Sequence, residues 1–346
     1  MYCDRRLGGV EDWHDCAPSD ADMRVPDKLL DCACFLCVKD GDLVKPGGTA
    51  FLVYVPVGKF IFYYLVTAKH CVTKAFEKYG ALYARINTAS GSSELVKLNG
   101  TWACSDDEGV DIAVLPWIPD AKYALGSVDI RTSAFEGNLK ANGIGIGNEV
   151  IVVGLFRLHY GSERNIPIVR HGILAAMPGE PLKEKHTNKP FKAYLAEIQS
   201  IGGLSGSPVF VFVPAMQLLA HHKNIEQRDA MRKRWPAGFL YLLGVIRGHF
   251  DAPQDDWIKD FEQESVHTGI AMVTPMDEVL SIVQNNKDLV KARTQRALEH
   301  QQEQSNAQTD DSAFEEPDRP FTQADFESAL RKVSRRIQPL RSGEEK

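Results

Sequence analysis

Short apolar runs, each broken by Gly, Pro, Asn or Asp, follow one another from about Leu29 to Phe250. They are rich in Val, Ile, Phe and Tyr, which are the side chains that fit a pleated sheet best. Many strands with few helical repeats favour a β-barrel or a sandwich over alternating β-α units. We expect the main strands at residues 49–57, 59–68, 111–117, 148–156, 169–177, 193–201, 208–213 and 239–246.

The segments outside these runs divide the chain. Residues 1–27 are polar and mixed, and we expect them to be a loose N-terminal arm. Residues 217–238 are strongly charged and separate two strands, so we expect a surface excursion there. Val279, Ile282 and Val283 recur at helical spacing and predict a short closing helix.

The C-terminal region changes character twice. Residues 285–320 are rich in Gln, Glu, Asp, Ser and Asn and hold few large apolar side chains, which predicts a disordered linker. Residues 321–346 contain an amphipathic helical pattern that Thr322 can cap. Docking on the same chain and binding to a protein partner both remain open for this helix. Its apolar face consists of Phe326, Leu330, Val333 and Ile337.

Composition and charge exclude several classes of function. The formal net charge of the 346 residues is −6, so no basic field draws the chain to nucleic acid. No apolar run reaches the ~20 residues that a membrane-spanning helix needs. The first residues lack the apolar segment of a secretory signal. The cysteines number seven, an odd count that favours a reducing compartment, so we expect a cytoplasmic protein.

The closest cysteines raise the question of a metal site. Cys32, Cys34 and Cys37 lie within six residues of one another, but no second close pair of cysteines or histidines completes a zinc site. A buried strand explains them better. We therefore expect neither a metal nor another cofactor.

The stretch GGLSGSPVF, residues 202–210, combines a flexible turn with the start of a strand. One interpretation is a loop that only reverses the chain. The other is a turn that presents Ser205 as a nucleophile, with its own N–H and that of Gly203 aimed at a developing oxyanion. Ser207 is a weaker candidate because it lies one step too near Pro208.

A serine nucleophile needs a base, and the base needs a group that orients it. His70 stands apart among the ten histidines because it follows an apolar strand directly, although a surface or core role is the alternative. Asp111 opens another apolar strand, where its carboxylate needs hydrogen bonds. The alternative for Asp111 is that it only satisfies nearby backbone N–H groups. Cys71 is expected to point away from His70, because neighbours on a strand face opposite sides.

The segments TAKHC, DIAVL and GLSGSP, in this order, resemble the three signature segments of the trypsin-like (chymotrypsin-fold) serine peptidases. Strands between them resemble the bacterial branches of that family, and the likeness runs from about residue 45 to 285. The resemblance implies an all-β fold of two six-stranded antiparallel β-barrels with a C-terminal helix. Residues 28–125 would form the first barrel and residues 126–284 the second with its closing helix.

The resemblance also implies a catalytic role for each of three residues. His70 and Asp111 would lie on the first barrel and Ser205 on the second, with the cleft between them. His70 would take the proton of Ser205, and Asp111 would orient the imidazole.

The sequence departs from the family pattern at several positions. Leu204 replaces the aspartate that digestive members use in activation, so activation by N-terminal cleavage is not expected. SGSPVF is nearest to the glutamyl endopeptidase branch, but Ile246 replaces the histidine that reads glutamate there. Gln199 replaces the aspartate that a preference for Arg or Lys requires. The remaining candidates for lining the cleft, which predict no substrate sequence, are Arg247, Gly248 and His249.

The sequence therefore predicts a cytoplasmic serine endopeptidase that acts on a protein or peptide. Two other classes remain as alternatives. One is a binding module that kept the fold of a peptidase and lost its turnover. The other is a regulated protease effector that docks on a partner through residues 321–346.

Overall fold

The computed structural model describes residues 3–4, 25–58, 60–183, 189–198, 203–221, 228, 237–252, 266–296 and 298–299. The contacts divide the chain into two units, Met1–Lys291 and Ala292–Lys346. The first unit contains all the strands named below. Most of the predicted N-terminal arm and the predicted amphipathic helix at 321–346 lie outside the described residues.

The N-terminal half forms a nine-stranded sheet with the main path β6-β5-β2-β3-β4-β8-β7. Two short strands join this path from the side, β1 (Cys3–Asp4) beside β4 and β9 (Val128–Asp129) beside β3. Leu36, Leu65 and Leu115 belong to the buried cluster that holds these strands together. The strands of the path are β2 (Ala33–Asp40), β3 (Leu43–Val57), β4 (Phe60–Thr67), β5 (Tyr83–Asn87), β6 (Ser93–Lys97), β7 (Ala103–Cys104) and β8 (Ala113–Pro116).

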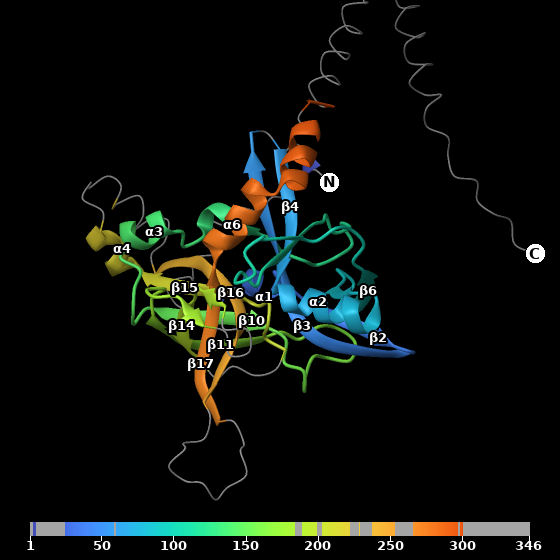
Figure 1. Ribbon diagram of the computed structural model, residues 1–346, viewed down its shortest axis with the longest axis horizontal. Coiled ribbons are helices and arrows are strands. Elements are labelled where there is room, and N and C mark those ends of the chain that lie inside the picture. Colours follow the sequence, from blue (N-terminus) through green and yellow to red (C-terminus); the bar gives the residue numbers. More distant parts are fainter. Residues whose placement is uncertain are drawn as a thin grey trace, which may run out of the picture. The chain divides into compact units, whose positions relative to one another are not determined.

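The C-terminal half forms a closed barrel in the order β10-β11-β14-β17-β16-β15, in which every pair is antiparallel. Every second residue of β15 faces its core, because Val209, Val211 and Val213 are fully buried in one cluster. Figure 1 shows these green to orange strands grouped apart from the blue β3–β4 hairpin. The barrel strands are β10 (Glu149–Gly154), β11 (Ile168–Ala176), β14 (Tyr194–Glu197), β15 (Pro208–Pro214), β16 (Gly238–Ala252) and β17 (Val266–Pro275).

The helices of the described residues are short. None of them is both long enough and apolar enough to cross a membrane. A two-stranded sheet of β12 (Leu182–Lys183) and β13 (Pro190–Phe191) completes the unit. Besides the helical residues 287–296, the helices are α1 (Asp27–Asp31), α2 (Lys69–Tyr79), the 3-10 helix η2 (Ile130–Thr132), α3 (Glu136–Ala141), α4 (Ala215–His221) and α6 (Met276–Asn285).

The predicted fold class is confirmed. The chain is mostly β, one region is a closed six-stranded barrel, the other is rich in sheet, and α6 is the predicted closing helix. Strand β9 lies past the predicted domain boundary at residue 125, yet it pairs with β3 of the N-terminal sheet. Strand β2 is the buried strand expected for Cys34 and Cys37, and Cys32 is buried just before it. Burial raises the pKa of both Cys34 and Cys37 to about 12.

The region predicted as a disordered linker begins differently. Residues 287–296 are helical. The side-chain oxygen of Asn286 accepts hydrogen bonds from the N–H groups of Asp288 and Leu289, both at 3.2 Å, so it caps this helix. Leu289 is buried. The prediction rested on the mean composition of residues 285–320, which does not show a single capping residue such as Asn286 or a single buried residue such as Leu289.

Candidate active site

His70 lies in the first turn of α2, directly after β4 ends at Thr67. Ala68 precedes the helix and offers no side-chain cap, so the first N–H groups need another acceptor. Asp111 supplies it from a distant part of the chain, because its Oδ1 accepts from the backbone N–H of His70 at 2.9 Å. The same carboxylate places Oδ2 at 2.7 Å from Nδ1 of the His70 ring.

The environment of the His70 ring controls its proton affinity. Burial alone lowers the pKa of His70. The hydrogen bond to Asp111 and the contact with Cys71 outweigh this effect, so the pKa lies above its ordinary value of 6.5. Asp111 is buried, and its carboxylate therefore acts on the ring with little screening from water.

Ser205 lies in a tight turn that leads directly into the barrel strand β15. The N–H of Ser207 donates to the carbonyl of Leu204 at 2.9 Å and closes the turn. Gly206 has φ +85°, and a Cβ there would lie 2.1 Å from the carbonyl oxygen of Thr49. Only glycine fits at this position.

The turn is joined to the barrel strand β16 on one side. The N–H of Gly206 donates to the carbonyl of Ile246 at 2.8 Å, and the N–H of Ile246 donates to the carbonyl of Ser207 at 2.9 Å. No residue within the described ranges accepts a hydrogen bond from the N–H of Gly203 or of Ser205. These two N–H groups are the donors predicted for an oxyanion.

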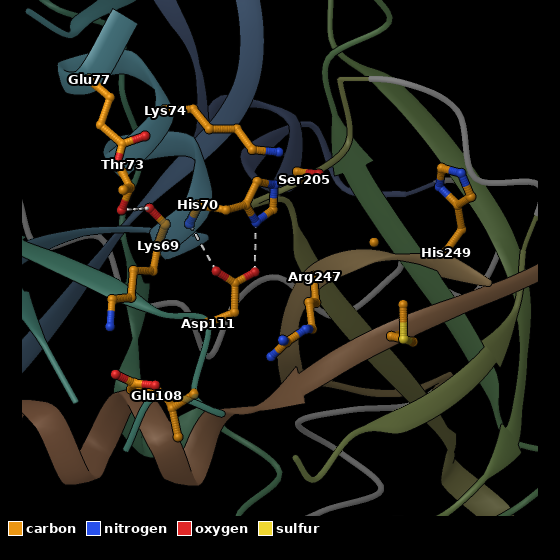
Figure 2. A pocket seen from close by; sticks show the side chains of 13 residues that line it. Lys69, His70, Thr73, Lys74, Glu77, Glu108, Asp111, Ser205, Arg247 and His249 are labelled. Carbon is orange, nitrogen blue, oxygen red and sulfur yellow. Dashed lines mark hydrogen bonds and ion pairs between the residues drawn. The ribbon is translucent and has the colours of Figure 1, made fainter. Parts of the chain in front are cut away.

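The three predicted catalytic residues line one groove with a volume of 610 Å³. Figure 2 shows the His70 ring between the Asp111 carboxylate and Ser205, with both hydrogen bonds of Asp111 drawn. His70 and Asp111 come from the N-terminal sheet region, and Ser205 comes from the turn before β15. The groove is therefore built from two regions of the chain that are far apart in sequence.

The contact partner of His70 Nε2 differs from the expectation. Cys71 Sγ lies 3.6 Å from Nε2, whereas no described residue accepts a hydrogen bond from Ser205 Oγ or donates one to it. The prediction that Cys71 points away from His70 is wrong. It assumed a strand, but both residues belong to α2, where neighbours are not held on opposite faces.

The predicted cleft residues fall into three groups. Gly248 and His249 line the groove. Arg247 lines it too, with its guanidinium donating to the carbonyl of Gly109 at 2.6 Å and lying 4.1 Å from the centre of the Phe191 ring. Ile246 is buried and does not line the groove. Gln199 lies outside the described residues.

Sequence reasoning missed the contribution of α2 to the groove. Lys69, Thr73, Lys74 and Glu77 line it together with His70. Their positions, at i, i+4, i+5 and i+8, would have placed them on one helix face, had residues 69–79 been recognised as a helix. The other lining residues are Glu108, Val110 and Met272.

No protein-family model matches the sequence, and no curated protein matches it significantly. Among solved structures, the chain is similar to the MamO protease domain of Magnetospirillum magneticum in its apo form, with 13% identity, a TM-score of 0.42, and coverage of 73% of this chain and 96% of that one. It is similar to Deg5 with 17% identity, a TM-score of 0.41, and coverage of 73% and 88%. It is also similar to the active form of the Rv3671c protease of M. tuberculosis, with 14% identity, a TM-score of 0.37, and coverage of 75% and 82%. At these TM-scores and identities, neither a family nor an activity follows for this chain.

Proposed function

We propose that this chain is a serine endopeptidase with His70 as general base, Asp111 as its orienting carboxylate and Ser205 as nucleophile. The observation that carries the proposal is the Asp111–His70 bond at 2.7 Å in a groove that Ser205 also lines. A carboxylate on Nδ1 leaves Nε2 as the basic nitrogen of the ring. Nε2 is the atom that must accept the proton of a serine hydroxyl.

The reaction would proceed in two steps. Ser205 Oγ attacks the carbonyl carbon of the substrate while its proton passes to His70 Nε2, and the carbonyl oxygen becomes an anion. The N–H groups of Gly203 and Ser205 stabilise this anion. His70 then gives the proton to the leaving amine as the C–N bond breaks. Water, activated by the same imidazole, hydrolyses the acyl-enzyme and restores Ser205.

The position of β16 in the groove supports a peptide as the substrate. Strand β15 pairs with β16 only as far as Val245, opposite Pro208. Gly248, three residues further along β16, lines the groove together with Ser205. An extended peptide can hydrogen-bond to the backbone of a strand that lines such a groove.

A fluorophosphonate probe tests the proposal, because it reacts with an activated serine. We expect the wild type to be labelled at Ser205, and Ser205→Ala to be unlabelled and to cleave no casein or library peptide. Ser207→Ala is the matched control, since Ser207 is buried and its Oγ bonds to no residue that the structure describes. Equal reaction of wild type and Ser205→Ala would rule the proposal out.

A catalytically silent binding module is the second candidate function. It is favoured by the contact of His70 Nε2 with Cys71 Sγ at 3.6 Å in place of Ser205 Oγ. An unlabelled wild type that still binds library peptides would select this candidate. A labelled wild type would exclude it.

We also propose a reducing compartment, the cytoplasm, for this chain. Cys34, Cys37, Cys71 and Cys104 are free thiols. Cys71 contacts the His70 ring, so its oxidation or pairing would disturb the site. Fractionation of the source cells tests the proposal, and recovery from an oxidising compartment with Cys71 in a disulfide would contradict it.

A further inference from the structure

Thr49 lies on β3 at the point where the N-terminal sheet contacts the turn that carries Ser205. Its side chain is 0% exposed. It is absent from the residues that line the groove, so it contacts no substrate there. Thr49 can therefore affect the reaction only through the groups to which it is hydrogen-bonded.

Thr49 makes two hydrogen bonds to the nucleophile turn. Its backbone N–H donates to the carbonyl of Ser205 at 2.9 Å. Its Oγ1 donates to the carbonyl of Gly203 at 3.0 Å. These carbonyls lie on either side of the peptide unit that joins Leu204 to Ser205.

Thr49 makes two more bonds that reach other elements. Its Oγ1 accepts from the N–H of Leu155, just after β10, at 2.9 Å. Its carbonyl accepts from Oγ1 of Thr67, the last residue of β4, at 2.7 Å. Thr67 stands three residues before His70. One buried residue therefore joins the nucleophile turn, the chain after β10 and the strand that leads to the base.

From this geometry we propose that Thr49 is a positioning residue that fixes the Ser205 turn relative to His70. The inference rests on the proposed peptidase function. Because a peptide unit is planar, holding a carbonyl also sets the direction of the N–H in the same unit. Thr49 holds the units that begin at Gly203 and Ser205, and the Ser207 N–H holds the unit between them. The N–H of Ser205, an oxyanion donor, belongs to that middle unit.

The hydroxyl of Thr49 is what this role requires. It donates to Gly203 and accepts from Leu155, and a hydroxyl can do both at once. Valine has nearly the same shape but offers neither function. Because the site is fully buried, no bulk water replaces the lost bonds. Serine keeps the hydroxyl and loses only a methyl group.

The test compares Thr49→Val with Thr49→Ser in the full chain. We expect Thr49→Val to slow fluorophosphonate labelling by about 10²-fold, which is the loss typical of a misplaced reacting group. For a peptide substrate the loss should appear in kcat and leave KM close to the wild-type value. Thr49→Ser should restore most of the rate.

Thr132→Val is the matched control. Thr132 is also buried, and its Oγ1 donates to the carbonyl of Asp129 at 2.7 Å, away from the groove. A general loss of fold should slow labelling equally in Thr132→Val and Thr49→Val. The proposal is overturned if these two variants lose the same rate, or if Thr49→Ser is as slow as Thr49→Val.

Amide hydrogen exchange gives a readout that needs no activity. We expect the amides of residues 203–207 to exchange faster in Thr49→Val than in wild type, Thr49→Ser and Thr132→Val. If the wild type is not labelled at all, the peptidase proposal fails, but exchange still decides whether Thr49 holds the turn. Unchanged exchange in Thr49→Val overturns the positioning role.

Discussion

The carboxylate of Asp111 bonds two groups of one residue, since Oδ1 takes the backbone N–H of His70 and Oδ2 faces its ring. The first bond caps α2, and the second sets which ring nitrogen carries the proton. The Asp111 side chain therefore both stabilises the start of α2 and orients the His70 ring. An amide at this position would keep the oxygen for the cap and present an NH₂ to the ring.

The substitution Asp111→Asn separates these two roles. We expect the cap to survive, since asparagine caps helices as well as aspartate does, and the unfolding midpoint to stay near that of the wild type. The rate of fluorophosphonate labelling should fall by about 10⁴-fold, because the amide stabilises the wrong imidazole tautomer. Asp107→Asn is the control, because the Asp107 side chain accepts from the backbone N–H of Gly109 at 2.8 Å and, among the described residues, bonds no imidazole. A loss of equal size in both variants would contradict the assigned role.

The raised pKa of His70 predicts a pH dependence. His70 must be neutral to accept a proton. The pH–rate profile of fluorophosphonate labelling should therefore have a rising limb that lies above pH 6.5. Protonated His70 also stabilises the fold below pH 6.5, and this contribution is lost as the pH rises through the raised pKa.

The variant Cys71→Ala tests the cause of this shift. It removes a group that raises the pKa of His70, so the limb of the pH–rate profile should move to lower pH. Cys104→Ala, which removes another partly buried thiol, should leave the limb in place. A limb that stays fixed or moves upward in Cys71→Ala would show that the thiol does not act on His70.

At the scale of elements, the Ser205 turn leaves no room for a side chain at position 206. Gly206 combines φ +85° with a place where a Cβ would meet the Thr49 carbonyl oxygen at 2.1 Å and Thr67 Oγ1 at 2.2 Å. The turn, β3 and the end of β4 are packed too closely for any side chain. Backbone conformation and close approach both require glycine.

We expect Gly206→Ala to lower the free energy of unfolding by roughly 3 kcal/mol, the sum of backbone strain and overpacking. Gly41→Ala is the control, because Gly41 also has a positive φ of +60° but no atom within 4 Å of a Cβ. That variant should lose only about 1 kcal/mol. Urea denaturation measures both. Equal losses would mean that the contact with Thr49 and Thr67 is relieved without cost.

At the scale of the whole molecule, the two β regions are joined by buried polar contacts as well as by the chain. Arg85 of β5 is largely buried and donates to the carbonyls of Tyr160, Gly161 and Ser162, which lie between β10 and β11. Asn165 of the same connection donates to the carbonyl of Arg85 at 2.6 Å. These bonds hold the loop after β10 on the N-terminal sheet.

The substitution Arg85→Met should lower the free energy of unfolding by about 2–4 kcal/mol, since it leaves buried carbonyls without their charged donor. Lys122→Met is the control, because the Lys122–Glu94 pair lies at the surface and contributes at most about 1 kcal/mol. Guanidinium denaturation of both variants checks the difference. A loss in Arg85→Met no larger than in Lys122→Met would show that the bonds of the Arg85 guanidinium add nothing to the stability of the fold.

Local pattern predicted much of this architecture. Runs of Val, Ile, Phe and Tyr predicted strands at the positions of β3, β4, β10, β15 and β16. The resemblance of the segments around His70, Asp111 and Ser205 to peptidase signature segments predicted that these residues would share a site, and they line one groove. Helix α2 was missed because its first turn has no side-chain cap of its own and depends on Asp111.

By itself, the sequence determined the kinds of element and the candidate chemistry, because side-chain periodicity and residue type act over a few neighbouring positions. The tertiary structure alone decided which groups meet. Thr49 bonds Gly203 across 154 residues, Asp111 caps a helix 41 residues earlier, and Cys71 rather than Ser205 contacts His70 Nε2. The first contact depends on how sheet and barrel pack against each other, and the others depend on where α2 lies within the N-terminal region, and no local pattern along the chain encodes either arrangement.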